Sequence, residues 1–386
     1  MLTKTDRREF LRTTGGIAAL TALASGNSTK AQTGPKAGWA IVGLGNYAQY
    51  AMQRFTASQQ SRIAALVSSD PAKAAQISNR YGVNSGNIYN YENFDSIKEN
   101  DDVSVVYIIT PNGTHSDLAI RAMEAGKHVI VEKTMAATSA DAIRMIQTAR
   151  RLDKKLMVAY RARFEPFNQN VIRMAREEEF GTITSIVAHK GFTIGNALGK
   201  NDWRLDRKLI GGGSLVDIGV YSIQACRYIA GAEPVEVTAT VSNTSGDPRF
   251  KDVEESIAFT LKFSNGCLAT GSSSWNYSLQ NYFRAVGTKG WVELNPATSN
   301  GNLRMFASKD VVRSGQAPQP SRVVEERHFT NIDQLPAMFD HFSDCVLNDK
   351  QPLLPMEEGL RDLEVIEAIY ESARTGRAIT PIYAEV

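Results

Sequence analysis

Short apolar segments alternate with stretches of helical periodicity over residues 38–160, and this alternation limits the possible folds of the chain more than any other feature. The apolar segments, which we predict to be strands, are residues 39–42, 63–67, 103–109, 128–131 and 156–159. The helical stretches between them are residues 47–56, 71–81, 115–125 and 139–152. A helix between two strands returns the chain to the end of the sheet where it started, so the strands run parallel. The sequence therefore predicts an α/β domain with a doubly wound parallel sheet over residues 32–160.

The turn after the first predicted strand has a G-x-G-x-x-A pattern that starts at Gly43, ends at Ala48 and opens a helix. The first glycine permits a tight turn, the second lets a pyrophosphate approach the backbone, and the small Ala48 lets helix and strand pack closely. A phosphate there would meet the free amide groups of a helix N-terminus. The motif predicts a Rossmann domain that binds a dinucleotide. The residues expected to contact it are Gly43, Leu44, Gly45, Asn46 and Tyr47.

The end of the second predicted strand favours NADP over NAD as that dinucleotide. An NAD site places a carboxylate there, about 20 residues after the glycine motif, to bind the ribose hydroxyls. Here the strand ends at Ser68, and Asp70 comes directly before Pro71, which is typical of a helix N-cap followed by proline. Ser68 can donate to a 2′-phosphate without repelling it, and Lys73 adds a positive charge. The alternative for Lys73 is an ordinary lysine on a solvent-exposed helix face.

Polar residues follow two further strands of the predicted parallel sheet. In an open α/β sheet, ligands bind beyond the carboxyl ends of the strands. The residues expected at this edge are Pro111, Asn112, His115, Glu132 and Lys133. Two alternatives are open: Lys133 could be a surface residue, and the loop before His115 could serve only to cap the next helix through Thr114.

The pattern changes from about residue 182 to long alternating strands, which predicts a second domain over residues 161–386. A helix at about 165–179 leads into it. The strands are expected at residues 183–192, 235–243, 254–264, 267–275, 280–287 and 290–294, and helices at about 214–230, 333–348 and 356–374. The turn Ser264-Asn265-Gly266 is a hairpin signal. We predict an α+β domain with a large, mainly antiparallel, open-faced sheet, whose last helices pack back toward the Rossmann domain.

The open face of that sheet predicts an oligomer. Strands such as residues 256–263 and 269–275 have apolar side chains that we expect on both faces, while the helices suffice to cover only one. A large apolar sheet face left in water is unusual for a monomer. We therefore expect the domain at residues 161–386 to bind the substrate and to form a two-fold homo-dimer or a homo-tetramer.

The helix that follows Gly211-Gly212-Gly213 contains an acid and a phenol, Asp217 and Tyr221, four residues apart and hence on one face. Such a pair could orient and deprotonate a hydroxyl group of a substrate. A nearby ammonium, such as that of Lys133, would favour the ionised phenol. The alternative is a core tyrosine whose hydroxyl bonds to its own helix.

Residues 1–31 predict an export signal. Arg7 and Arg8 form a twin-arginine pattern, and a weakly apolar run follows at residues 13–24. That run is shorter than the about 20 residues that span a bilayer. No cysteine lies near it, which excludes a lipoprotein anchor. We expect transport of the folded protein by the twin-arginine translocase to the periplasm, with no membrane anchor; the alternative is a basic amphipathic helix of a cytoplasmic protein.

The composition restricts the possible partners. The formal net charge is +2, and several of the basic residues belong to residues 1–31, so nothing indicates a nucleic acid partner. The three cysteines, Cys226, Cys267 and Cys345, are widely spaced and form no metal-binding pattern, so no metal is expected.

Together these motifs resemble those of the glucose–fructose oxidoreductase, inositol dehydrogenase and rhizopine-catabolism oxidoreductase family, most closely its glucose–fructose branch. The resemblance extends from about residue 36 to the C-terminus. It rests on four stretches: residues 40–45, 125–133, 211–221 and 371–377.

The resemblance implies an enzyme that oxidises a cyclic aldose at C1 to the lactone by hydride transfer to NADP. In such an enzyme Lys133 would contact both the sugar C1 hydroxyl and the cofactor, Asp217 would position the sugar, and Tyr221 would accept the hydroxyl proton. Ser68 and Lys73 match 2′-phosphate ligands. The segments that line the active site of relatives match Arg161, which would contact both cofactor and sugar, and Trp203 and Arg204.

The sequence departs from the family pattern at two places. Thr134 replaces the proline that follows the catalytic lysine, where relatives have a cis bond, so a cis and a trans Lys133–Thr134 bond are both open. The proline-rich arm that wraps the cofactor in the glucose–fructose enzyme is reduced to about residues 25–37. The hydride could pass to a second sugar while NADP stays bound. Two other functions remain open: an NAD-dependent glycosidase with a transient hydride step, and a non-catalytic sugar or cofactor sensor.

Overall fold

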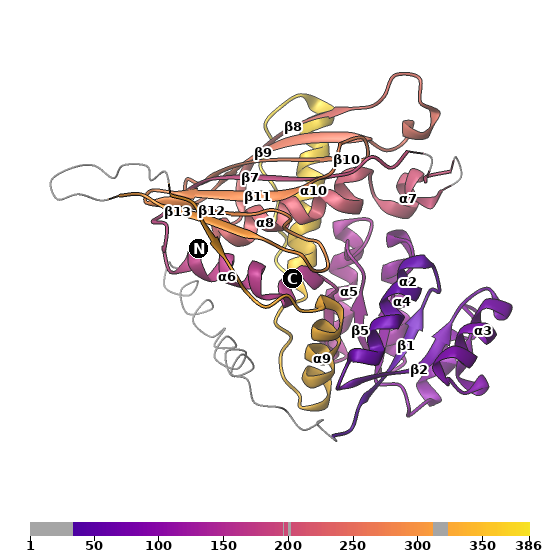
Figure 1. Ribbon diagram of the computed structural model, residues 1–386. Coiled ribbons are helices and arrows are strands. Elements are labelled where there is room, and N and C mark those ends of the chain that lie inside the picture. Colours follow the sequence, from indigo (N-terminus) through magenta and orange to yellow (C-terminus); the bar gives the residue numbers. More distant parts are fainter. Residues whose placement is uncertain (1–33, 196, 200–201, 312–322) are drawn as a thin grey trace.

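The computed structural model describes residues 34–195, 197–199, 202–311 and 323–386 (Figure 1). The predicted export signal at residues 1–31 lies outside these residues. The described chain forms two domains, an α/β domain followed by a larger α+β domain whose sheet lies apart from the first (Figure 1).

The first domain is the predicted Rossmann domain, with a parallel sheet that winds in both directions from its first strand. The six strands, in the order β3-β2-β1-β4-β5-β6, are β1 (Ala37–Val42), β2 (Ser61–Val67), β3 (Ile88–Tyr89), β4 (Val105–Ile108), β5 (His128–Val131) and β6 (Leu156–Val158). The helices between them are α2 (Asn46–Arg54), α3 (Pro71–Tyr81), α4 (His115–Glu124) and α5 (Ser139–Arg151). The doubly wound sheet is confirmed, and only the two-residue β3 was not predicted.

The second domain contains an eight-stranded, mainly antiparallel sheet, as predicted. In the order β14-β13-β12-β11-β7-β10-β9-β8, its strands are β7 (Ile183–Gly191), β8 (Pro234–Ser242), β9 (Ser256–Phe263), β10 (Leu268–Ser274), β11 (Gln280–Gly287), β12 (Gly290–Leu294), β13 (Met305–Lys309) and β14 (Glu325–Arg327). The predicted hairpin joins β9 and β10, and only the pair β7 and β10 is parallel. Strands β13 and β14 were not predicted.

Helices cover one face of this sheet. They are α6 (Pro166–Arg176), α8 (Val220–Ala230) and α10 (Glu357–Thr375), which contact β12, β7 and β8 respectively (Figure 1). The stretch Arg207–Ala230, which includes α8, is long and apolar enough to cross a membrane, but 78% of its 18-residue apolar window is buried inside the protein, as in a core helix.

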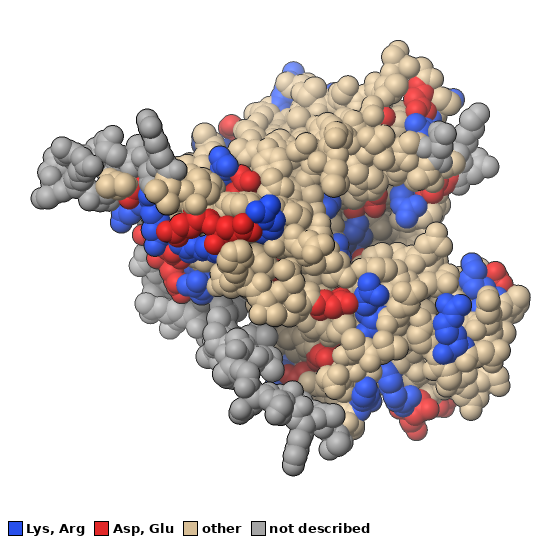
Figure 2. Space-filling model, viewed as in Figure 1, with Lys and Arg blue, Asp and Glu red and all other residues tan. Residues whose placement is uncertain are grey.

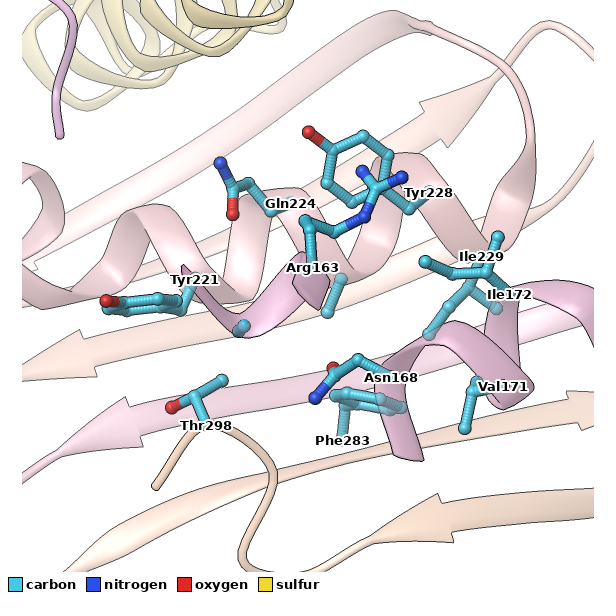
Figure 3. Close-up of a pocket in the computed structure, with 12 residues that line it drawn as sticks. Arg163, Asn168, Val171, Ile172, Tyr221, Gln224, Tyr228, Ile229, Phe283 and Thr298 are labelled. Atoms are coloured by element: carbon cyan, nitrogen blue, oxygen red, sulfur yellow. The ribbon is translucent and has the colours of Figure 1, made fainter. Parts of the chain in front are cut away.

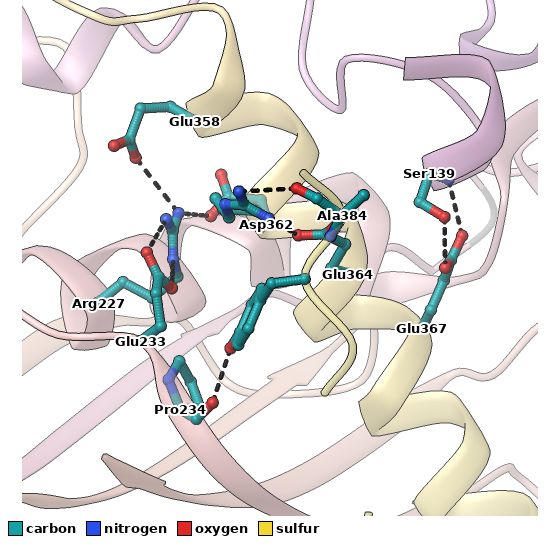
Figure 4. Close-up of polar contacts among 11 residues, drawn as sticks. Ser139, Arg227, Glu233, Pro234, Glu358, Asp362, Glu364, Glu367 and Ala384 are labelled. Atoms are coloured by element: carbon teal, nitrogen blue, oxygen red, sulfur yellow. Dashed lines mark hydrogen bonds and ion pairs between the residues drawn. The ribbon is translucent and has the colours of Figure 1, made fainter. Parts of the chain in front are cut away.

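A buried cation fixes α8 to α10. The Arg227 side chain is 3% exposed and pairs with Asp362 on α10 at 2.5 Å, with Glu233 at 2.7 Å and with Glu358 at 3.4 Å (Figure 4). Removal of one partner from such a buried pair leaves an uncompensated charge, which is strongly destabilising. The ion pairs therefore hold in place the helix on which Tyr221 lies.

The other face of the sheet is open and of mixed polarity. Our expectation that β9 has apolar side chains on both faces is wrong, because Ala258, Thr260 and Lys262 alternate with its buried residues. A row of side chains nevertheless crosses the open face, where β10, β7, β11 and β12 lie side by side. In register, this row consists of the apolar Leu268, Val286 and Trp291, with the small Ser185 between Leu268 and Val286.

Helix α9 (Gln334–Leu347) belongs to the second part of the sequence but packs on the Rossmann sheet. The fully buried Trp39 ring of β1 lies edge-on to Phe339 and Phe342, with ring centroids 5.3 and 6.0 Å apart. The Trp39 Nε1 donates to Ser343 Oγ at 2.9 Å. The core of the first domain is therefore completed by a helix near the C-terminus.

Candidate active site

The loop between β1 and α2 forms an open cradle for a dinucleotide. Gly43 has φ +88°, and a Cβ there would lie 2.6 Å from the Ile109 carbonyl oxygen, so the turn requires glycine. A Cβ at Gly45 would meet nothing within 4 Å, so the space over the loop is free. No side chain caps α2 at Gly45. Its first amides are thus available to a pyrophosphate, and the residues present fit the predicted dinucleotide.

The carboxylate nearest to the end of β2 is used to cap a helix. Asp70 accepts the amide of Lys73 at 2.9 Å at the start of α3, and the Ser68 hydroxyl accepts the Asp70 amide at 3.1 Å. The Lys73 side chain is 45% exposed, and its ammonium lies 3.9 Å from the Asp70 carboxylate. Lys73 is therefore accessible where a 2′-phosphate is predicted, whereas Ser68, at the same strand end, is only 9% exposed.

Lys133 and Asp217 come from the two domains and meet between them. Lys133 follows β5, and its Nζ lies 3.7 Å from Asp217 Oδ1 and donates to the Asp217 backbone carbonyl. The Asp217 Oδ2 accepts the indole N–H of Trp275 at 3.1 Å. Asp217 is thus oriented by a cation on one side and by a buried tryptophan on the other. Trp275 was not among the predicted site residues.

Two side chains of the Rossmann domain, those of His115 and Asn112, hold the segment that follows Lys133. The Lys133–Thr134 peptide bond is cis, which decides the alternative that the sequence left open. His115 Nδ1 and Nε2 lie 3.1 and 2.8 Å from the carbonyl oxygens of Thr134 and Thr110. Asn112 Nδ2 donates to Thr134 Oγ1 at 3.0 Å and to the Ile210 carbonyl at 2.9 Å.

His115 and Asn112 therefore position the Lys133 segment. His115 is fully buried, and burial lowers its pKa to about 4. The expected direct contact with the cofactor is not available to the His115 side chain, because the surrounding backbone covers it. Pro111 directly precedes Asn112 in the same loop and is partly exposed.

The turn that bears Asp217 is a π-helix, Leu215–Gly219, which leads directly into α8. π-Helical turns are rare in proteins, and those that occur are frequently found at functional sites. Buried Glu254 anchors the turn, because its carboxylate accepts the amides of Gly213 at 2.8 Å and Leu215 at 2.9 Å. The predicted helix is confirmed, but its first turn is wider than the expected α-helical spacing.

Three cationic side chains surround the ring of Tyr221. The Nζ atoms of Lys133 and Lys190 lie 5.8 and 5.7 Å from the ring centroid, and the Arg161 Cζ lies 5.8 Å from it. Arg161 Nη2 donates to the Thr298 carbonyl at 3.1 Å. The structure thus brings Lys133, Arg161, Asp217 and Tyr221 together as predicted, and adds Lys190, which the sequence analysis missed.

Two other ionisable groups near these residues, Tyr47 and Glu132, have raised pKa values. Burial and the neighbouring Glu132 raise the pKa of Tyr47 well above its ordinary value. Burial likewise raises the pKa of Glu132, which accepts a hydrogen bond from the Tyr107 hydroxyl. Tyr47 and Tyr107 therefore both favour the protonated phenol.

Trp203 and Arg204 lie in the short 3₁₀ helix η8 (Trp203–Leu205), before α7 (Arg207–Ile210). Arg204 stacks over the Trp203 ring at 4.7 Å and pairs with Asp202 at 3.1 Å. Within the described part of the chain, neither residue makes a hydrogen bond or an ion pair with the Lys133–Asp217–Tyr221 group. Their predicted contact with a sugar therefore stays a prediction.

The surface is hollowed between the two domains, and lysine and arginine side chains gather there (Figure 2). Behind Tyr221, a smaller cavity separates α8 from α6 and the preceding loop (Figure 3). The side chains of Gln224, Tyr228, Arg163 and Asn168 line it together with Tyr221. Tyr221 therefore borders an internal cavity that polar and apolar side chains line together.

Comparisons with known proteins agree with this architecture. Residues 37–160 match the model "Oxidoreductase family, NAD-binding Rossmann fold", and residues 168–293 match "GFO/IDH/MocA C-terminal domain". The chain is 32% identical to D-xylose 1-dehydrogenase [NADP(+)] of Haloarcula marismortui, over 87% of this chain and 91% of that protein. It is 28% identical to D-xylose 1-dehydrogenase (NADP(+)) 2 of Haloferax volcanii, over 83% of this chain and 93% of that protein.

A solved structure is also similar over nearly the whole described chain. The aldose-aldose oxidoreductase from Caulobacter crescentus, complexed with glycerol, superposes with a TM-score of 0.82 at 43% identity. The match covers 89% of this chain and 99% of that one. Both domain models, the curated relatives and this structure thus lead to one assignment: the chain belongs to the GFO/IDH/MocA family of oxidoreductases.

Proposed function

We propose that this protein is an NADP-dependent sugar oxidoreductase that oxidises a cyclic aldose at C1 to the lactone. The observation that supports this most directly is the meeting of Lys133, Asp217 and Tyr221 beyond the carboxyl end of β5, between the glycine cradle and the second domain. The names of the relatives, which are NADP-dependent xylose dehydrogenases and an aldose-aldose oxidoreductase, support the cofactor and the substrate class.

Each residue has a distinct role in this proposal. NADP, when bound at the glycine cradle and Ser68, supplies the hydride acceptor. Lys133 and Asp217 bind and orient the sugar through its C1 hydroxyl and a neighbouring oxygen. Tyr221 accepts the proton of the C1 hydroxyl as the C1–H bond breaks, so a hydroxyl becomes a carbonyl and the phenol holds the proton. Lys133, Arg161 and Lys190 surround the Tyr221 ring with positive charge.

The experiment that tests this proposal is a substrate panel. Purified protein is mixed with NADP and single aldoses, and the formation of NADPH is followed together with that of the lactone. We expect both products in equal amounts. A second ketose or aldose, added without free NADP, then tests whether hydride passes between sugars on the bound cofactor. Release of an aglycone from glycosides without a lactone would instead identify a glycosidase.

We predict that the protein binds NADP at least about tenfold more tightly than NAD, which one charge-assisted contact can supply. The reason is that Ser68 and an accessible Lys73 lie where an NAD site has a free carboxylate. Lys73→Ala is expected to weaken NADP binding by about tenfold and to leave NAD binding unchanged. Fluorescence titration with both cofactors measures this, with the exposed Lys98→Ala as the control. Equal affinities of the parent protein for NADP and NAD would refute the prediction.

We predict a homo-oligomer, at least a dimer, formed through the open sheet face. Leu268 and Val286 lie in the row across that face and are 51% and 36% exposed. Leu268→Glu places a charge there and is expected to yield monomers, whereas Ile382→Glu, 86% exposed in the C-terminal segment, should not. Light scattering at micromolar concentration distinguishes these results. A monomeric parent protein would contradict the prediction.

We further propose that residues 1–31 direct export of the folded, cofactor-loaded protein to the periplasm by the twin-arginine translocase. The support is the pair Arg7 and Arg8 before a short apolar run. Replacement of both arginines by lysine is expected to retain the protein in the cytoplasm, as fractionation would reveal. Unchanged export of that variant would rule the proposal out.

A further inference from the structure

Residues 298–300, in the loop between β12 and β13, connect the second domain with the Rossmann domain. The loop is anchored to its own sheet, because the Thr298 amide and hydroxyl donate to the Asn281 side-chain oxygen of β11 at 3.2 and 2.8 Å. Two residues further on, the contacts lead to the other domain. We call residues 298–300 the interdomain strap.

The first residue of the strap, Thr298, lies against the candidate active site. Its carbonyl oxygen accepts from Arg161 Nη2 at 3.1 Å, and its hydroxyl accepts from Lys190 Nζ at 2.8 Å. The side chains of Arg161 and Lys190 both approach the Tyr221 ring. Thr298 is therefore fixed to the wall of side chains that surrounds Tyr221.

The last residue of the strap, Asn300, directs its side chain to elements of the first domain and to the helix that packs on it. Asn300 Nδ2 donates to the Tyr50 hydroxyl of α2 at 2.7 Å and to Asp333 Oδ1, directly before α9, at 3.3 Å. Asn300 Oδ1 accepts the Gln334 amide at 3.3 Å. The side chain of Asn300 therefore binds α2 and α9 together.

Tyr50 is held at this point by a second group. The Arg54 Cζ lies 4.6 Å from the centre of the Tyr50 ring, and Arg54 Nε pairs with Asp333 at 2.9 Å. Tyr50 lies about one turn after Asn46, the first residue of α2, where the glycine cradle ends. The cofactor cradle and the wall around Tyr221 are therefore joined through one short loop.

We propose that Asn300 is a positioning residue, which through Tyr50 holds α2, and with it the cofactor cradle, at a fixed distance from the wall around Tyr221. Two domains of one chain move relative to one another unless contacts hold them. Reacting atoms must lie about 3–3.5 Å apart, and a misplacement of about 1 Å can cost about 10²-fold in rate. This inference rests on the proposed function for its kinetic test, but not for its hydrogen-exchange test.

The kinetic experiment breaks the link between the domains from both sides. Tyr50→Phe removes only the oxygen that accepts from Asn300, so the ring stays packed under Arg54. Asn300→Ala removes the donor. Each variant is expected to lower kcat per bound NADP by about ten- to hundredfold, with the KM for the sugar and the stoichiometry of NADP binding close to those of the parent. The double variant should be little worse than Asn300→Ala alone, because both substitutions remove the same bond.

The control is Asn170→Ala on α6. Among the described residues, the side chain of Asn170 bonds only to Pro166 and Arg173 of its own helix, so this variant should keep the parent kcat. A lower stoichiometry of NADP binding with an unchanged kcat per bound NADP would mean loss of folded protein and would overturn the proposal. An unchanged kcat in Tyr50→Phe overturns it as well. If Asn300→Ala does not fold, Tyr50→Phe still breaks the same bond.

The second measurement needs no turnover. Amide hydrogen exchange of the parent and of both variants, with and without NADP, is followed by mass spectrometry over α2 and β1. We expect faster exchange in α2 alone, because the helix loses a contact while the sheet below it keeps its own. Parent-like exchange in α2, or a rise in β1 as well, overturns the inference. If the parent oxidises no sugar, the proposed function fails, while hydrogen exchange still decides whether Asn300 holds α2.

Discussion

Tyr221→Phe is expected to lower turnover of aldoses by about 10²–10⁴-fold, which is the usual contribution of a general base. The variant loses only the hydroxyl, so packing of the half-buried ring on α8 hardly changes. The glycine cradle and Ser68 lie on other elements, and NADP binding should therefore persist. Steady-state kinetics measure the loss, and cofactor titration and circular dichroism test that the fold is intact.

The pH dependence separates loss of the base from a packing defect. If Tyr221 is the base, the residual activity of Tyr221→Phe should no longer show the acid limb of the parent. Tyr228→Phe, on the same helix and beside the same internal cavity, is the matched control and should stay within a few-fold of the parent. Parent-like turnover by Tyr221→Phe would remove Tyr221 from the mechanism, and Asp217 would become the candidate base.

Lys133→Ala is expected to lose at least as much activity as Tyr221→Phe. In the proposed mechanism the change removes a contact to the sugar, and it also removes the ammonium that lies 3.7 Å from the Asp217 carboxylate and 5.8 Å from the centre of the Tyr221 ring. The Asp217 carboxylate, whose side chain is 20% exposed, would keep only the indole N–H of Trp275 as an oriented donor. Steady-state kinetics at saturating NADP separate the two effects: loss of the sugar contact raises KM, and loss of help to the chemical step lowers kcat.

The losses of activity caused by Lys133→Ala and Tyr221→Phe should not multiply when the two substitutions are combined. Residues that act as one unit give a double variant little worse than either single one. We therefore expect the double variant, Lys133→Ala with Tyr221→Phe, to be about as active as the less active of the two single variants. A double variant whose losses multiply would mean that Lys133 and Tyr221 act in separate steps, and would contradict the mechanism proposed above.

The parallel sheet and the cofactor cradle could be predicted because their signals are local. A buried strand, a glycine turn and a helix follow one another within about twenty residues, and each has its own periodicity. The same holds for Asp70, whose place before Pro71 predicted the helix cap that the structure contains. The end of a strand predicted Lys133 and the helical spacing predicted the pair Asp217 and Tyr221, whereas the family pattern joined these two distant segments into one site.

The residues that the sequence did not reveal act through contacts between distant segments. Trp275 orients Asp217 from the loop after β10, and Glu254 anchors the π-helical turn from the segment before β9. Lys190 had one detectable signal: it is a charged residue at an alternate position of β7, where the pattern requires an apolar side chain. The short strands β13 and β14 had no such signal, because strands of three to five residues without alternation resemble loops.

The placement of α9 on the Rossmann sheet has a consequence for synthesis of the protein. Trp39 and Ser343 are 304 residues apart in the sequence, yet they share a hydrogen bond in the core of the first domain. A nascent chain that ends before residues 334–347 lacks Phe339 and Phe342, so only Phe55 and Tyr107 remain to pack against the Trp39 ring. The core of the first domain is therefore complete only after α9 has been synthesised, although the domain itself is synthesised first. Until α9 is made, the face of the first sheet that it covers stays open to chaperones, and this lasts for most of the translation time.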